Sequence, residues 1–336
     1  MENDYQPEQP DDQGPYMPRR VDLIDANGRS RTVQDNEPRG EIPTRKRLAL
    51  FLLVTTCIST FFAGMIPGGG MPNLFLIVQL YQQGILPQAE LLQFLQNGAY
   101  FSLALMAILG AHEMGHFLQA VRYKVPASLP YFIPMPITPF GTMGAVIFQG
   151  AGVADRKQMF DIAISGPLAG LVLALPIAFY GVSNSETAII PPEHQGASYG
   201  DPLILEWMVE AVHGPMAENE DVLLNNNPLL FAGWVGIFIT ALNLIPIGQL
   251  DGGHILYSLF RKRAHAVATT LLWGAVGYMV YTGYYAYLMM VILLMFMGPR
   301  HPPTANDYVP LGTMRIILGW LTLGFIIIGF TPMPLK

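Results

Sequence analysis

The stretch QNGAYFSLALMAILGAHEMGHFLQAV, residues 96–121, combines two properties that rarely occur together. It is long and apolar enough to cross a membrane, because the roughly 30 Å hydrocarbon layer takes about 20 residues of helix. Near its end it carries His112, Glu113 and His116. Such groups cost about 2.5 kcal/mol or more each inside a bilayer, so their presence there requires a functional reason. The stretch therefore predicts a membrane helix that contains a functional site.

The spacing of these three residues suits a metal site. Residues four positions apart lie one turn apart on the same face of a helix, so His112 and His116 can both reach one ion. Glu113 lies beside them and could act as a general base on a water that the metal polarises. The alternative is a run of polar side chains that lines a water-filled path for protons or ions.

The rest of the chain continues the membrane pattern. Of its 336 residues, 51% are hydrophobic and only 12% charged, and the mean hydropathy is +0.36. These values are typical of a membrane protein. About seven transmembrane helices are predicted, at residues 48–66, 96–121, 159–182, 228–248, 264–282, 284–298 and 313–330. The expected fold is an all-α polytopic membrane protein.

The basic residues indicate how these spans are oriented. Arg45, Lys46 and Arg47 precede the first span, and cytoplasmic loops carry the excess of lysine and arginine. The loop at residues 183–227 contains neither lysine nor arginine but several acidic residues. The N-terminus is therefore expected in the cytoplasm, and the 183–227 loop is expected outside it.

Two parts are expected along the chain. Residues 1–46 are rich in Asp, Glu, Gln, Pro and Gly, so they are predicted to form a disordered cytoplasmic tail. Residues 47–336 are predicted to form one membrane domain, because they show neither an internal repeat nor a second folded module.

Asp251 is the predicted third metal ligand. Catalytic zinc usually takes three protein ligands and keeps a fourth position open. The segment NLIPIGQLDGGH, residues 243–254, places Asp251 at the cytoplasmic end of the fourth predicted span. His116 also lies toward the cytoplasmic end of its own span, so the two residues are expected at the same depth.

The two motifs together resemble those of the site-2 protease family of intramembrane zinc metalloproteases. The similarity covers residues 96–260 and pairs His-Glu-x-x-His with Asn-x-x-Pro-x-x-x-Leu-Asp-Gly-Gly. The resemblance implies that His112, His116 and Asp251 bind one Zn²⁺ and that Glu113 is the catalytic acid and base. It also implies that Asn243 lies near the scissile peptide, where its amide could stabilise an oxyanion. An interhelical hydrogen bond is the alternative role for Asn243.

Two further segments are similar to elements of that family. Residues 165–170, SGPLAG, resemble its glycine-proline helix, except that Ala169 stands where many relatives carry asparagine. Dense prolines at residues 126–139 exclude a helix, and residues 140–148 favour a turn followed by a strand. In the family this region is a small re-entrant β element near the active site. An ordinary cytoplasmic loop is the alternative.

A substrate-binding role is predicted for the same segment. A transmembrane substrate hides its peptide bonds within its own helical hydrogen bonds, so a protease must bind it in an extended form. An exposed strand edge at residues 142–148 could pair with such a segment. The predicted substrate-binding residues are Asn243, Gly141, Thr142, Gly144 and Ala145.

These features predict a membrane zinc metalloprotease that hydrolyses peptide bonds of transmembrane protein substrates within the bilayer. It would belong to the subgroup that lacks a large accessory domain. The alternatives are a catalytically silent metal-binding membrane chaperone and a transporter. The expected location is the bacterial cell membrane, and a plastid membrane is the alternative.

The net charge limits the classes of partner, and the cysteine and two further histidines are assigned other roles. The net charge of −6 argues against a nucleic-acid partner, so transmembrane proteins and the lipid bilayer are the expected partners. A single cysteine, Cys57, precludes an internal disulfide. His254 follows Asp251 by three residues and is predicted either to support a metal ligand or to lie at a helix start. His301 lies beside basic residues and is predicted to face water or lipid headgroups.

Overall fold

The computed structural model describes residues 20–24, 30–34, 45–68, 72, 74–150, 152–189, 199–216 and 220–334. The chain forms two compact units, Met1–Glu41 and Ile42–Lys336. In the first unit, β1 (Arg20–Ile24) pairs with β2 (Ser30–Gln34) as an antiparallel hairpin, which the sequence does not predict. The rest of the predicted tail before Arg45 lies outside the described residues, and its disorder stays a prediction.

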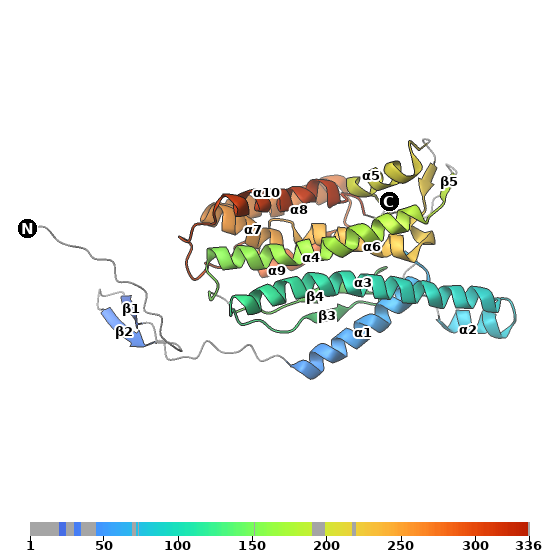
Figure 1. Ribbon diagram of the computed structural model, residues 1–336, viewed down its shortest axis with the longest axis horizontal. Helices are drawn as coiled ribbons and strands as arrows, with labels where there is room; N and C mark the ends of the chain where they lie inside the picture. The colour runs from blue at the N-terminus through green and yellow to red at the C-terminus, as the bar shows by residue number, and fades with distance from the viewer. Residues whose placement is uncertain are drawn as a thin grey trace, which may run out of the picture. The chain divides into compact units, whose positions relative to one another are not determined.

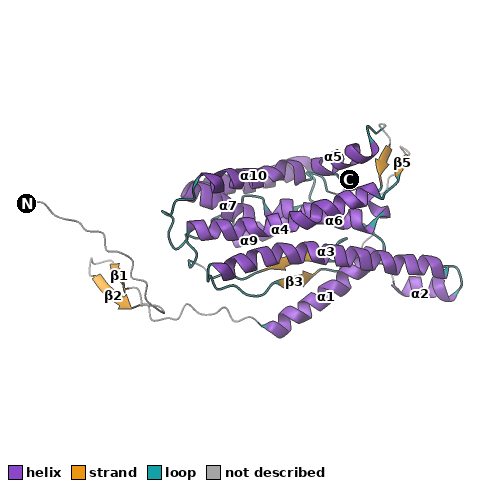
Figure 2. Ribbon diagram, viewed as in Figure 1, coloured by secondary structure: helices purple, strands orange, loops and turns teal. Residues whose placement is uncertain are grey.

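The second unit is built mainly from helices, as expected (Figures 1 and 2). Its α-helices are α1 (Lys46–Met65), α2 (Leu74–Gln82), α3 (Gln88–Arg122), α4 (Arg156–Ser183), α5 (Leu203–His213), α6 (Pro228–Asn243), α7 (Asp251–Phe260), α8 (Ala264–Thr282), α9 (Leu288–Met297) and α10 (Thr313–Gly329). Two short 3₁₀ helices are η1 (Leu224–Asn226) and η2 (Arg261–Arg263). Its described strands form two antiparallel pairs. β3 (Tyr131–Pro134) and β4 (Thr142–Val146) form a hairpin, whereas β5 (Thr187–Ile189) and β6 (Glu220–Val222) pair across a segment that contains α5.

Three described helices, α1, α3 and α4, are long and apolar enough to cross a membrane. Each of them covers one of the predicted spans. α6, α9 and α10 lie within three further predicted spans and are apolar, but they are only 10–17 residues long. The chain is therefore a mainly helical membrane protein.

Two helices differ from the predicted span boundaries, and proline and glycine explain why. α6 ends at Asn243, short of the predicted end at residue 248, because residues that precede a proline such as Pro246 disfavour helical backbone. α9 begins at Leu288, after α8 ends at Gly283 in the left-handed conformation with φ +70°.

The core lies where α3, α4 and α6 pack together, and small residues bring their backbones close (Figure 1). A Cβ atom on Gly233 of α6 would lie 2.6 Å from the backbone of Ala178 in α4. Aromatic rings fill the adjoining space, with Phe231 stacked on Trp234 at 6.1 Å between ring centroids. The indole N–H of Trp234 donates to the Gly200 carbonyl at 3.0 Å, so its buried polar atom is satisfied.

The β3–β4 hairpin is the small β element that the sequence predicts between the second and third spans. β4 matches the predicted strand, whereas the prolines conceal β3 as a strand in the sequence. Pro134 is tolerated because it stands at the end of β3, where no ladder N–H is required. α1 packs along β3, so one side of the hairpin is covered by a membrane helix.

The segment predicted as an outer loop contains regular structure. β5, α5 and β6 lie within residues 183–227, and residues 190–198 and 217–219 of this segment are outside the described part of the chain. α5 buries Leu205 and packs against α4 and α10. The sequence of α5 does contain the apolar pattern of a helix, but the acidic residues around it obscure that pattern.

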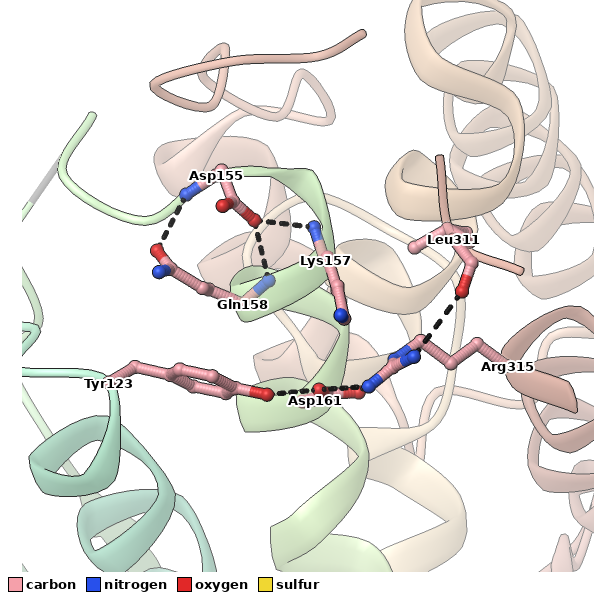
Figure 3. Close-up of polar contacts among 7 residues, drawn as sticks. All are labelled: Tyr123, Asp155, Lys157, Gln158, Asp161, Leu311 and Arg315. Atoms are coloured by element: carbon pink, nitrogen blue, oxygen red, sulfur yellow. Dashed lines mark hydrogen bonds and ion pairs between the residues drawn. The ribbon is translucent and has the colours of Figure 1, made fainter. Parts of the chain in front are cut away.

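A polar network ties the ends of three helices together (Figure 3). Asp161 of α4 accepts from the Tyr123 hydroxyl, just past α3, at 2.5 Å. It also accepts two bonds from the Arg315 guanidinium of α10, at 2.7 and 2.9 Å. Asp155 caps the start of α4 by accepting from the backbone N–H groups of Lys157 and Gln158. One carboxylate thus holds α3, α4 and α10 in register.

Replacing Asp161 should therefore destabilise the membrane bundle. Asp161→Ala removes all three bonds and leaves Arg315 without its partner, so we expect a loss of about 1–3 kcal/mol. Tyr123→Phe removes one bond and should cost about 1 kcal/mol or less. Unfolding of both variants in the same detergent measures the difference. Equal stabilities for the two variants would contradict the central role of Asp161.

Candidate metal and catalytic centre

The three predicted metal ligands meet at one point. His112 and His116 lie one turn apart in the second half of α3, and Asp251 is the first residue of α7. The Nε2 atom of His112 lies 3.1 Å from Asp251 Oδ2, and Nε2 of His116 lies 3.3 Å from Asp251 Oδ1. One donor atom from each residue lies within 4.8 Å of the other two. The structure thus brings together the three residues that the sequence predicts to share one site.

The donor set fits a zinc ion. Two imidazole nitrogens and one carboxylate oxygen form a ligand set of the catalytic type, which keeps a further position for water or substrate. The Nδ1–H of His116 donates to the Ile162 carbonyl of α4 at 2.8 Å. This bond leaves the lone pair on Nε2, the atom that faces Asp251, as metal binding requires.

Glycines of α4 make room for both histidines. A Cβ atom on Gly166 would lie 2.0 Å from Nε2 of His116, and one on Gly170 would lie 3.2 Å from Nδ1 of His112. Gly115 of α3 faces α4 in return, and its Cβ atom would lie 2.5 Å from the Ser165 carbonyl oxygen. The glycine spacing of residues 165–170 therefore matches the histidine spacing of α3.

Asp251 is placed by close packing at both ends of its short helix. A Cβ atom on Gly252 would lie 1.7 Å from the Leu244 carbonyl oxygen, and one on Gly253 would lie 2.4 Å from that of Gly248. At the far end, Arg156 of α4 donates to the carbonyls of Ser258 and Leu259 at 2.6 and 3.2 Å. Asp251 therefore begins a separate helix and does not end the fourth span, which corrects the expectation from sequence.

A cavity of about 280 Å³ opens beside the three residues. Glu113 lines it with a side chain that is almost fully buried, next to His112. Asn243, the last residue of α6, and His254 of α7 also line it. Apolar residues of the hairpin segment, α4 and α9 form much of the remaining wall, among them Met143, Ile147, Met159, Ile162, Leu293 and Met297.

Some of the predicted substrate-binding residues line the cavity, and others lie outside its wall. Asn243 and Ala145 line the cavity. Gly141 instead packs on α1, where a Cβ atom would lie 2.5 Å from the Ser59 carbonyl oxygen. The buried Thr142 hydroxyl donates to the Ile133 carbonyl and accepts from the N–H of Gly144. These three residues shape the hairpin, and their substrate contact stays a prediction.

Sequence reasoning missed cavity residues and misplaced one histidine. The missed ones include Met159 and Ile162 from α4 and Leu293 and Met297 from α9. Met143 and Ile147 also line the cavity and lie within the strand edge predicted at residues 142–148. No local pattern marks α9 as part of the cavity.

His301 is buried, so its predicted exposure is wrong. Its Nε2 atom lies 2.5 Å from Nδ1 of His254, and the Tyr257 ring stacks on it at 4.3 Å. Burial lowers the pKa of His301 to about 3 and that of His254 to about 4, so both rings are neutral at pH 7. The packing of α7 against the 298–308 segment creates this environment.

Gly166→Ala should weaken metal binding. The added methyl group would occupy the position of the His116 ring, and displacement of a ligand by its supporting residues typically costs about 10–100-fold in metal affinity. Gly110→Ala is the matched control, because a Cβ atom on Gly110 of α3 would meet no atom within 4 Å. Metal titration of both folded variants tests this, and wild-type affinity in Gly166→Ala would show that the helices separate freely.

Comparison with known proteins is consistent with this geometry. Peptidase family M50 matches residues 100–283. "Probable zinc metalloprotease EGY1, chloroplastic" is 31% identical in Oryza sativa subsp. japonica, over 80% of this chain and 47% of that protein. The Arabidopsis thaliana protein of the same name is 30% identical over 73% of this chain and 45% of its own length.

Another relative matches a similar share of this chain. "Probable zinc metalloprotease EGY2, chloroplastic" from Oryza sativa subsp. indica is 27% identical over 86% of this chain and 53% of its own length. The chain thus spans about half the length of the curated relatives it matches. The family match covers more than half of the chain, including His112, His116 and Asp251. The chain therefore belongs to peptidase family M50, the site-2 protease family of intramembrane zinc metalloproteases.

Proposed function

We propose that this chain is an intramembrane zinc metalloprotease that hydrolyses peptide bonds of transmembrane protein substrates. The observation that carries this proposal is the convergence of His112, His116 and Asp251 beside the buried carboxyl group of Glu113. The names of the relatives, which are metalloproteases, favour this function over the chaperone and transporter alternatives.

Each residue of the site has a proposed role. His112, His116 and Asp251 would hold one zinc ion, which when bound supplies a Lewis acid that polarises a peptide carbonyl and acidifies water. Glu113 would accept a proton from the attacking water and return it to the nitrogen of the leaving amine. Asn243 lines the same cavity, so its amide N–H can donate to the substrate carbonyl oxygen.

Metal content and cleavage test these roles separately. The purified chain should contain about one zinc ion, and the His112→Ala, His116→Ala double variant should lose it. Glu113→Gln should keep the zinc but reduce cleavage of a model transmembrane substrate about 100-fold or more. His213→Ala, which removes a histidine of α5, is the control for both measurements. Full zinc content in the double variant would refute the ligand assignment.

The hairpin supports a proposal for how substrate is held. Met143 and the consecutive residues 145–147 line the catalytic cavity, so this segment forms part of its wall. Among the described residues, β4 pairs only with β3, and α1 packs along β3. We infer that the other edge of β4 binds the unwound substrate as an added strand.

Proline substitutions test the strand edge. Ala145→Pro and Ile147→Pro remove backbone donors, so both should keep zinc and reduce cleavage about tenfold or more. Ala145→Ser and Ile147→Ala keep the backbone N–H and serve as controls for the side chains. Wild-type cleavage of helical substrates by both proline variants would eliminate strand addition.

The finer topology also stays a proposal. Seven spans with a cytoplasmic N-terminus follow from the basic residues, and Arg122 and Arg156, at the two ends of the α3–α4 connection, agree with that orientation. The bacterial cell membrane stays our prediction for the location. The relatives are named chloroplastic, which is consistent with the alternative location, a plastid membrane.

Cysteine labelling in a Cys57→Ala background tests this orientation. Cysteines introduced at Ser198 and Lys336 should react with a membrane-impermeant reagent from outside. Those at Arg20 and Arg263 should react only after the membrane is opened. A cytoplasmic position for Ser198 would overturn the seven-span topology.

A further inference from the structure

A second cavity lies on the other side of the hairpin, at the start of α1. It measures about 430 Å³ and is lined by Arg45, Leu48, Leu52, Ser128, Tyr131, Ile133, Val146 and Phe148. None of these residues is a predicted catalytic or metal-binding residue. The cavity is therefore distinct from the catalytic cavity, although both adjoin the same two strands.

Most of the wall is apolar and uncovered. Leu48 and Val146 are each about two-fifths exposed, and the Phe148 side chain is 59% exposed. α1 is a candidate membrane span, so this open wall adjoins the hydrocarbon region. An alkyl chain is the occupant that satisfies such a wall, because it leaves no polar atom without a partner.

Arg45 is the charged residue among those that line the cavity, and Lys46 and Arg47 follow it in sequence at the start of α1. Among the described residues, no carboxylate forms an ion pair with these three cations. The Tyr131 hydroxyl accepts from the backbone N–H of Arg45 at 3.0 Å, so its own hydrogen is free to donate to an anionic oxygen.

We propose that this cavity binds an anionic phospholipid of the surrounding bilayer. One acyl chain lies against Leu48, Leu52 and Phe148, and the phosphate lies at Arg45 and Tyr131. Basic clusters that adjoin apolar crevices at the membrane interface recognise anionic headgroups in this way. A neutral zwitterionic lipid fits the apolar wall equally well but gains less from the three cations.

The lipid cavity and the catalytic cavity share part of their walls. Ile133 and Val146 line both cavities, so two strand residues separate the lipid from the catalytic centre. An acyl chain that packs on Ile133 and Val146 restricts the movement of the strands. The lipid site itself does not depend on the proposed protease activity.

Lipid binding can be measured directly by native mass spectrometry of the full chain released from nanodiscs. Equal amounts of phosphatidylglycerol and phosphatidylcholine should yield mainly the phosphatidylglycerol adduct. The Arg45→Gln, Lys46→Gln, Arg47→Gln variant should lose this preference, by about fivefold for each cation removed. Lys262→Gln with Arg263→Gln, at the basic η2, is the charge control and should keep it.

A second pair of variants tests the cavity itself. Leu48→Trp fills the apolar wall and should remove the adduct, whereas Leu50→Trp lies on α1 outside the cavity and should keep it. Circular dichroism confirms that each variant is folded. Equal binding of the two lipids by the wild type, or an unchanged adduct in both the triple variant and Leu48→Trp, would overturn the proposal.

Discussion

The close approach of α3 and α4 is the constraint on which the catalytic geometry depends. At Gly166 the two helices come so near that any side chain would occupy the space of the His116 ring. The same approach brings the Ile162 carbonyl within hydrogen-bond distance of that ring and so fixes its orientation. α3 therefore supplies the two histidines of the proposed metal site, and the packing of α4 constrains where they point. The glycines of α4 and the histidines of α3 are thus complementary parts of one helix–helix contact.

α4 also controls the second element of the site. Its first residue, Arg156, binds the last carbonyls of α7, where a positive charge complements the helix dipole. A few residues further on, Asp161 joins the end of α3 to α10. Arg156 and Arg315 thus act near the first turns of α4, while the glycines Gly166 and Gly170 act further along the helix. Polar bonds and close packing are separated along one helix.

The sequence predicts those parts of the structure that depend on local spacing. His112, Glu113 and His116 are placed by helical periodicity alone, and the apolar runs locate the long helices. The position of Asp251 does not follow from local spacing alone. α6 ends at Asn243, and a loop leads from there into α7, where Asp251 is the first residue. His301 was mispredicted because its burial depends on Tyr257, a residue distant in sequence whose ring covers it. β3 was missed because Pro134 and the prolines around it oppose a strand, and β3 is stabilised by β4 and α1, which are distant in sequence or follow a turn.

The distance along the chain between the proposed ligands has a consequence for biogenesis. Asp251 follows His112 by 139 residues, and α4, α5 and α6 lie between them. A nascent chain that has inserted only α1 to α6 has both histidines in the membrane but lacks the carboxylate. The proposed centre would therefore be completed only after α7 has been synthesised and has packed against α4. Proteolytic competence would thus be delayed until most of the bundle is assembled, which protects neighbouring nascent membrane proteins from an immature enzyme.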